Sequence, residues 1–487
     1  MISEQAGSKR LQVRQLLVRT ALAMGAMLVG VVLGLALTSN SWKIVITAVG
    51  WTALMGAILL DPLLGLLLWV VVSPYAPFVH LNFSLGAGIP DLGLDRVAAG
   101  LFCMVMLAQV ARRRRRLAPL TALDGAILLF AMALVMSARA ATGGTFTALQ
   151  NILDAWLVPL LIYYLAKNLV RDQRGMRRVI AALALIGSYL VLLTVYEHLT
   201  GNEVFVVFGR FSSYGENLKR INSLLQNPAY MALALNMVLP FAVRASLTAR
   251  DRTGRWGYAL AALAVLGTVV SLYNRAGWLS GLLVLLVSAA YHRPLRKWLL
   301  LAVVIIVPVA ALSWGMVSDS ALFSDRLTYG LSVDYRVRAM EAALQLVASQ
   351  PLFGVGFGSF STLSLTQGLL TKVTANYWVP TTHNSYLDVL ASAGLSGMVP
   401  YVAIFLIIAW QSWRLYRRQS QEPAVDRGLI VALWCVFLVF AVTIATVDVV
   451  AAPFCSMVFW LIVGSVMGSQ SWPTRWGRRA AASEGAA

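Results

Sequence analysis

Long apolar runs recur along the whole chain, and they constrain its fold more than any other feature. Fourteen stretches of roughly 16 to 27 residues are predominantly apolar, and about 20 such residues suffice to cross a hydrocarbon core of roughly 30 Å. Only 12% of the residues are charged, whereas soluble domains average about 25%. These values exclude an ordinary soluble protein and predict an all-α polytopic membrane protein.

The predicted spans are 20–37, 42–60, 62–80, 96–111, 122–139, 149–167, 177–199, 227–245, 256–273, 276–291, 297–317, 385–411, 428–447 and 451–468. The first is longer than the apolar core of a typical signal peptide, so we expect it to be retained. The chain then divides into eleven spans over 1–317, an outer loop over 318–384, and three spans with a tail over 385–487.

Basic residues give this arrangement its orientation. With the N-terminus in the cytoplasm, the inner segments are 1–19, 112–116, 167–178, 244–255, 293–297, 414–427 and 475–479, and they hold 28 of the 39 lysines and arginines. Cytoplasmic loops carry such an excess, so both termini are predicted to be cytoplasmic. The net charge of +19 is explained by these loops, and we expect no nucleic-acid partner.

The outer loop contains a predicted helix over 334–349. Val337, Met340, Leu344 and Val347 recur at spacings of three and four, with Arg338, Glu341 and Gln345 on another side, which is typical of an amphipathic helix. Asp334 is its expected N-cap, Pro351 marks its end, and it could lie on the membrane surface. The following Gly354, Gly356 and Gly358 are interpreted as a turn, since a phosphate-binding loop requires a preceding strand.

His383 is the predicted catalytic residue, because it closes the polar loop immediately before Asn384, Ser385 and a span. A histidine there could be neutral at physiological pH and accept a proton; the alternative is a capping neighbour without chemistry. Arg275 lies at a tight turn between two apolar runs, where a permanent charge needs a partner or a function. Arginine side chains suit phosphate oxygens.

The remaining chemistry-bearing residues give weaker patterns. The outer carboxylates form neither a DxD motif nor a cluster with metal-ligand spacing, so we expect no metal. Asp388 could lie near His383 on the same helix, and Asp448 at an outer turn could meet an arginine. The three cysteines lie inside apolar runs and have no metal-ligand spacing.

Three segments resemble the O-antigen ligase and polymerase family of bacterial membrane glycosyltransferases. They are RINSLLQNPAYMALALNMVLP from Arg220, LYNRAGWLSGLLVLL around Arg275, and Arg336-x-x-x-Met340 followed by ALQLVASQPLFGVGFGSF and HNSYLDVLASAGLSG. The resemblance covers roughly 220–397. It departs from the family pattern at Asn274, where serine is usual, and at Met340, where an aromatic residue is common.

The resemblance implies a function at the outer face of the inner membrane, without metal, nucleotide sugar or other cofactor. A glycan would pass from undecaprenyl diphosphate to lipid A–core in a ligase, or to a second carrier-linked repeat in a polymerase. His383 would be the base, Arg275, Arg336 and Arg220 would bind the diphosphate, and Arg338, Asn384 and Tyr386 would support them. Direct attack by the acceptor would invert the anomeric centre.

Other classes of function remain open at this point. A flippase of lipid-linked oligosaccharides can also have fourteen spans, but it should carry charges deep in its spans and outlets on both faces. Here the spans are almost uncharged at mid-depth and the polar mass lies on one face, which favours an enzyme. A catalytically silent scaffold would tolerate replacement of His383.

Overall fold

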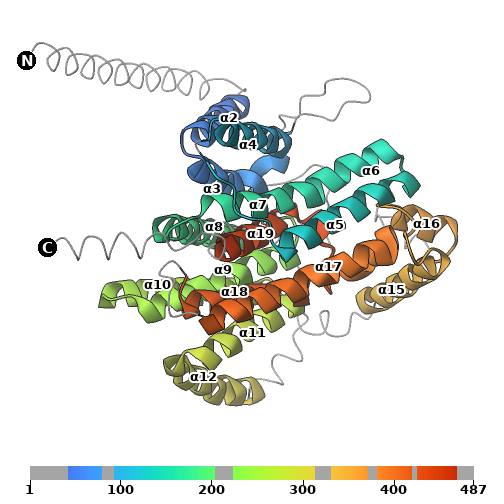
Figure 1. Ribbon diagram of the computed structural model, residues 1–487. Helices are drawn as coiled ribbons and strands as arrows, with labels where there is room; N and C mark the ends of the chain where they lie inside the picture. The colour runs from blue at the N-terminus through green and yellow to red at the C-terminus, as the bar shows by residue number, and fades with distance from the viewer. Residues whose placement is uncertain are drawn as a thin grey trace, which may run out of the picture.

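The computed structural model describes residues 42–78, 93–113, 115–202, 204, 223–312, 331–370, 381–418 and 425–468, and every regular element in these ranges is helical. Figure 1 shows an elongated bundle of helices, with α15 and α16 at one end. The elements are α2 (Trp42–Leu60), α3 (Pro62–Val72), η1 (Ser73–Phe78), α4 (Leu94–Ala111), α5 (Ala122–Ser137), η2 (Ala138–Ala140), α6 (Thr145–Ile152), η3 (Leu153–Leu157), α7 (Val158–Leu169), α8 (Gln173–Thr200), α9 (Pro228–Thr248), α10 (Arg252–Ser271), α11 (Arg275–Tyr291), α12 (Arg293–Leu312), α15 (Leu331–Ser349), α16 (Phe360–Thr366), α17 (Ser385–Arg418), α18 (Arg427–Thr443), η4 (Val449–Ala451) and α19 (Pro453–Gly468).

The predicted all-α class is therefore confirmed. Each expected span from 42–60 onward coincides with one helix or a run of consecutive helices, whereas 20–37 and both termini lie outside the described residues. Within the described part, seven helices are long and apolar enough to cross a membrane. The count of fourteen and the cytoplasmic location of the termini stay predictions.

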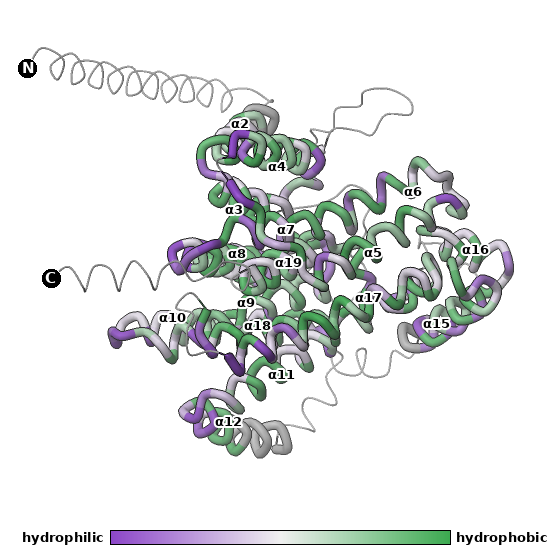
Figure 2. The backbone as a smooth tube through the Cα atoms, in the orientation of Figure 1, coloured by the Kyte–Doolittle hydropathy of each residue, from purple (hydrophilic) through white to green (hydrophobic). Residues whose placement is uncertain are grey.

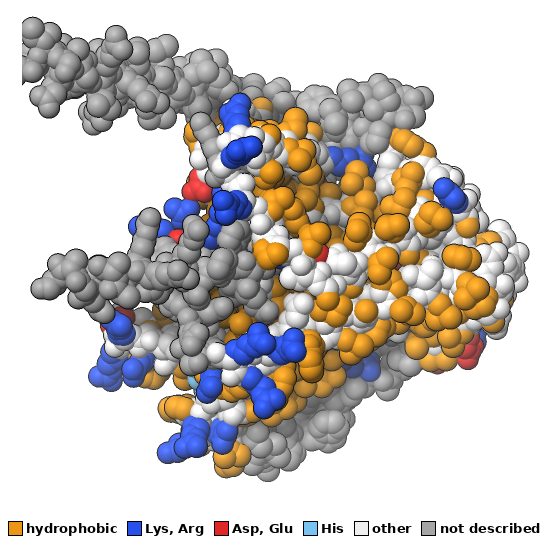
Figure 3. Space-filling view, viewed as in Figure 1, with side chains coloured by type: hydrophobic (Ala, Val, Ile, Leu, Met, Phe, Trp, Pro, Cys, Tyr) orange, Lys and Arg blue, Asp and Glu red, His pale blue; other side chains and the backbone are white. Residues whose placement is uncertain are grey.

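The segments expected in the cytoplasm contact one another at one end of the bundle. Arg115 donates to the Asn168 carbonyl at 3.0 Å, and Arg171 donates to the Arg116 carbonyl at 2.7 Å. Two other segments expected in the cytoplasm, 244–255 and 414–427, are joined by an ion pair between Arg244 and Asp426. Hydrophilic residues and Lys and Arg side chains gather at the end where α8 and α10 begin (Figures 2 and 3). This grouping is what a common cytoplasmic face requires.

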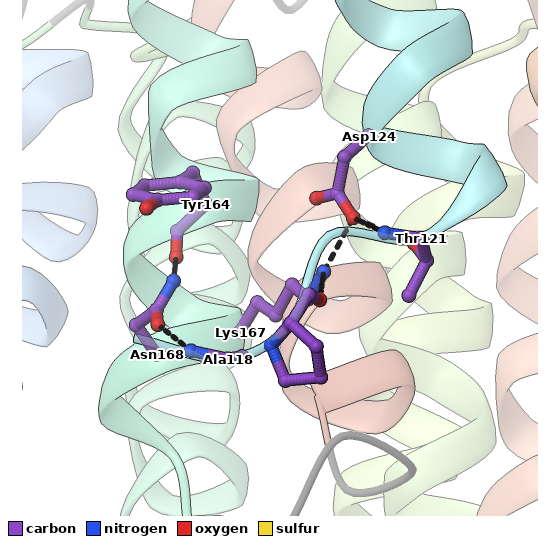
Figure 4. Close-up of polar contacts among 7 residues, drawn as sticks. Ala118, Thr121, Asp124, Tyr164, Lys167 and Asn168 are labelled. Atoms are coloured by element: carbon purple, nitrogen blue, oxygen red, sulfur yellow. Dashed lines mark hydrogen bonds and ion pairs between the residues drawn. The ribbon is translucent and has the colours of Figure 1, made fainter. Parts of the chain in front are cut away.

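A buried ion pair fixes the start of α5 against the end of α7 at this basic end. Lys167 is 1% exposed, and its ammonium lies 2.5 Å from an Asp124 carboxylate oxygen. The same oxygen accepts hydrogen bonds from the Thr121 backbone and hydroxyl, both at 2.6 Å, and Lys167 also donates to the Pro119 carbonyl at 3.0 Å (Figure 4). Because both charges have partners, burial costs them far less than it would cost an isolated ion.

At the other end, α17 folds back on itself at Gly394, whose φ of 62° and ψ of −159° interrupt the helix. Fifteen residues of straight helix would separate Tyr386 from Tyr401 by about 22 Å, yet their ring centroids lie 5.9 Å apart. Residues 385–393 and 395–418 therefore form a helical hairpin. The predicted uninterrupted span over 385–411 is corrected in this respect, and 395–418 is the part long enough to cross a membrane.

The turn after α15 closes this hairpin. The break at Gly394 leaves backbone groups without helical partners, and such groups must be satisfied elsewhere. Four hydrogen bonds with the turn supply them: Leu395 N to Pro351 O at 2.8 Å, Ser396 N to Leu352 O at 3.0 Å, Val355 N to Ala391 O at 2.8 Å, and Gly356 N to Ser392 O at 3.1 Å. The interpretation of 354–358 as a turn is thus confirmed, with its glycines at φ of 71°, 99° and 73°.

The predicted amphipathic helix exists as α15, but it begins earlier than expected. It begins at Leu331, so Asp334 lies inside its first turn and is not the N-cap. The residues that pack against the protein are Ala339, Ala342, Ala343 and Leu346, whereas Val337, Met340 and Leu344 are exposed. Small side chains are favoured on the packed face because they let α15 approach its neighbours closely.

Candidate functional site

The backbone around His383 is held in an unusual conformation. His383 has a φ of 49°, in the left-handed region that costs a residue with a Cβ atom about 1–2 kcal/mol. Asn384 follows as the N-cap of α17, where its side-chain oxygen accepts from Tyr386 N at 3.0 Å and Leu387 N at 3.2 Å. A strained residue persists only where its surroundings over-determine it, so the position of His383 is tightly specified.

The surroundings that fix it come from the connection between α18 and α19. Ser385 donates its backbone N–H to the Ile444 carbonyl at 2.8 Å and its hydroxyl to the Val447 carbonyl at 2.9 Å, and the same hydroxyl oxygen accepts from Val449 N at 2.8 Å. Tyr386 adds a hydrogen bond from its hydroxyl to the Ala441 carbonyl at 3.0 Å. Two residues after His383, the chain is therefore anchored to the end of α18.

Helix α15 lies against the imidazole. The rings of Tyr335 and His383 meet edge to face with their centroids 5.7 Å apart. Burial and the neighbouring Arg336 guanidinium lower the pKa of His383 from 6.5 to about 4. At neutral pH His383 is thus uncharged, and a neutral imidazole has one nitrogen able to accept a proton.

Arg275 lies at the same end of the bundle. It is the first residue of α11, where the Asn274 side chain caps the helix by accepting from Gly277 N at 2.7 Å. Further along α11, the Ser280 hydroxyl lies 3.0 Å from that of Thr443, the residue before Ile444 in the His383 anchor. Arg275 is five residues earlier than Ser280, or about 7.5 Å along the axis, so it extends past the end of α18. A helix N-terminus adds partial positive charge there.

The structure thus separates the predicted residues into groups. It brings His383 and Arg336 together and places Arg275 at the same end. Arg338 is exposed on α15, whereas Asn384 and Tyr386 use their polar groups in the structural hydrogen bonds above. Arg220 lies outside the described residues.

Three residues around this segment have contacts that the sequence pattern did not assign. Tyr335 contacts the imidazole, and Ser385 anchors the backbone, although only their adjacency to Arg336 and His383 marks them in the sequence. Asp448 lies close enough to Asp388 for the two carboxylates to interact electrostatically, and burial raises the pKa of Asp448 to about 6. The sequence suggested that Asp448 could meet an arginine; in the described residues its carboxylate accepts from Val450 N at 3.3 Å and interacts electrostatically with Asp388.

Chemically, the arrangement offers one neutral base beside cationic groups. Arg336 lies next to the imidazole, and guanidinium groups bind phosphate oxygens in a bidentate manner. A phosphorylated leaving group gains negative charge as it departs, and preorganised cations stabilise that charge. The site is thus suited to transfer from a phosphorylated donor to a hydroxyl group.

Comparison with known families agrees with this reading. Residues 259–402 match the family model described as O-antigen ligase. The matched stretch includes Arg275, Arg336 and His383, and it runs from α10 into the hairpin of α17. A search of curated proteins finds no match to the chain.

Proposed function

Because residues 259–402 match the O-antigen ligase family model, we propose that this chain is a multi-pass membrane glycosyltransferase, a ligase acting at the outer face of the bacterial inner membrane. Its donor is a glycan on undecaprenyl diphosphate, and its acceptor is lipid A–core. The observation that carries the proposal is the contact of α15 with His383, which puts the Arg336 charge beside a neutral imidazole. This pair lies at the end of the bundle away from the basic loops.

In the proposed reaction, the acceptor hydroxyl attacks the anomeric carbon of the donor sugar. His383 takes the hydroxyl proton as the new carbon–oxygen bond forms, and the bond from the anomeric carbon to the diphosphate oxygen breaks. Undecaprenyl diphosphate leaves with the electron pair, stabilised by Arg336 and Arg275, and by Arg220 as a further candidate. Direct displacement inverts the anomeric centre. A diphosphate needs little protonation to depart, so cationic stabilisation and one base complete the scheme.

The proximity of Arg336 to His383 predicts a measurable change in the histidine pKa. Arg336→Gln should raise the pKa of His383 from about 4 towards 6.5, since the guanidinium is one of its two causes, while burial keeps it below 6.5. ¹³C-histidine NMR can follow the titration, with His383→Ala assigning the resonance among four histidines. Arg338→Gln, two residues further along an exposed side of α15, is the control.

The pH dependence of stability follows from the protonation state of His383 that the folded protein favours. The folded protein prefers neutral His383, so the contribution of this group to stability is present above about pH 6.5 and is lost as the pH falls towards 4. Binding of an anionic diphosphate at Arg336 should raise the pKa in the same direction as Arg336→Gln. Equal shifts in the Arg336 and Arg338 variants would contradict a specific interaction.

Reconstituted transfer tests the proposed function directly. Purified protein receives an oligosaccharide on undecaprenyl diphosphate, with either lipid A–core or a second copy of the donor as acceptor, in the presence of EDTA. We expect transfer to lipid A–core. Chain growth on the second donor would instead assign a polymerase, and lipid scrambling in vesicles without transfer to either acceptor would assign a flippase.

A further inference from the structure

Helix α15 has three faces where a surface helix normally has two. One face packs against the protein through Ala339, Ala342, Ala343 and Leu346. The second carries the exposed Asp334, Arg338, Glu341 and Gln345. The third, which we call the apolar stripe, consists of Val337, Met340 and Leu344, with side chains 48%, 40% and 52% exposed.

The helical repeat separates these faces cleanly. At 100° per residue, the apolar stripe is centred about 145° from the packed face and about 95° from the charged face. The stripe is a row spaced by three and four residues, the pattern of a helix face that is buried. In this helix the protein buries a different face, so the stripe needs another apolar environment.

Exposed apolar residues that follow the stripe along the chain lead to the apolar surface of the bundle. Leu352 and Phe353 follow α15 and are 60% and 69% exposed. The Leu352 carbonyl accepts from Ser396 in α17 at 3.0 Å, and further along α17 the side chains of Val399 and Leu406 are 64% and 66% exposed. Val399 and Leu406 belong to α17, which is long and apolar enough to cross a membrane. Hydrophobic side chains cover the bundle over α5 and α17 up to the end that carries α15 and α16 (Figure 3).

We propose that the apolar stripe of α15 lies in the hydrocarbon of the outer leaflet, so that lipid, rather than water or protein, covers this face. The occupant follows from continuity with the apolar surface of α17 and from the charged row on the adjacent face, which suits the headgroup region. A tripartite helix of this kind sits where protein, lipid and water meet.

Such a placement has a consequence for the site, and this step rests on the proposed function. Arg336 immediately precedes the stripe, and Arg336, Met340 and Leu344 share one side of the helix at spacings of four. Lipid contact along the stripe therefore holds Arg336, and the Tyr335 ring beside His383, at the level of lipid phosphates. A lipid-linked diphosphate can then reach them by lateral diffusion without leaving the bilayer.

Spin-label accessibility of the full chain in nanodiscs tests the lipid contact. In a Cys103→Ser background, since Cys103 is the exposed one of the three cysteines, single cysteines replace Val337, Met340 or Leu344, with Arg338, Glu341 and Gln345 as matched positions on the charged face. We expect stripe labels to collide with oxygen more than with a water-soluble nickel chelate, and labels on the charged face to show the reverse. Strong collision of stripe labels with the nickel chelate would overturn the proposal, because it would place them in water.

Two further measurements separate the other outcomes. Low collision of stripe labels with both reagents, with a dipolar interaction between two labelled copies, would assign the stripe to a protein interface and overturn the proposal. The variant Met340→Gln/Leu344→Gln should raise the KM for the lipid-linked donor by about tenfold, whereas Gln345→Ala should leave it unchanged. Accessibility does not depend on turnover, so it decides the lipid contact even if the proposed reaction fails.

Discussion

Replacement of His383 by alanine is expected to lower the rate of glycan transfer by roughly 10²–10⁴-fold, the usual contribution of a positioned general base. The structure gives the reason, because His383 is neutral at physiological pH and lies beside the Arg336 charge that would hold the diphosphate. The transfer assay with lipid A–core measures the loss. Size-exclusion chromatography and the midpoint of thermal unfolding establish that the variant is folded.

The left-handed backbone at His383 supplies the decisive control. Glycine and asparagine adopt a positive φ more readily than other residues, so His383→Gly and His383→Asn retain or ease the native conformation at 49°. Neither side chain can accept a proton as imidazole does. If both variants are as inactive as His383→Ala, the lost function is that of the base; recovery of activity by His383→Asn would show that the histidine is a structural residue.

Local patterns in the sequence predicted the helices because each pattern is read within one segment. Apolar runs correspond to helices from α2 to α19, and the basic loops contact one another as a shared face requires. The turn at 354–358 and the end of α15 before Pro351 were also predictable, because glycine and proline constrain their own backbone. His383 was identifiable from its place at the boundary between a polar loop and an apolar run.

Features that depend on distant segments were not predictable in this way. The hairpin at Gly394 requires backbone partners about forty residues earlier, and nothing within LASAGLSG distinguishes it from a glycine-containing span. The packed face of α15 consists mainly of alanines, which the row of large apolar residues does not mark; close approach to α17 favours such small side chains. The pairing of Arg336 with His383 is likewise a tertiary contact, which the resemblance implied and residue spacing alone did not.

The turn at 354–358 positions the segment that follows His383, and this makes its glycines a sensitive point. Gly356 has a φ of 99°, and a Cβ atom added there would lie 2.4 Å from the Ala140 backbone carbon and 2.5 Å from its oxygen. Gly358 has a φ of 73°, with nothing within 4 Å of its added Cβ. The two positions share an unfavourable backbone conformation and differ in steric contact.

Alanine at the two positions should therefore separate strain from clash. Gly358→Ala is expected to destabilise the protein by about 1–2 kcal/mol through backbone conformation alone, with transfer activity retained. Gly356→Ala adds overpacking of about 1–3 kcal/mol and displaces the turn whose hydrogen bonds hold Ala391 and Ser392. Thermal unfolding in detergent should show the larger loss for Gly356→Ala, together with loss of transfer to lipid A–core. Equal destabilisation by the two variants would mean that the turn yields to the clash, and that the hairpin of α17 does not depend on its close approach to Ala140.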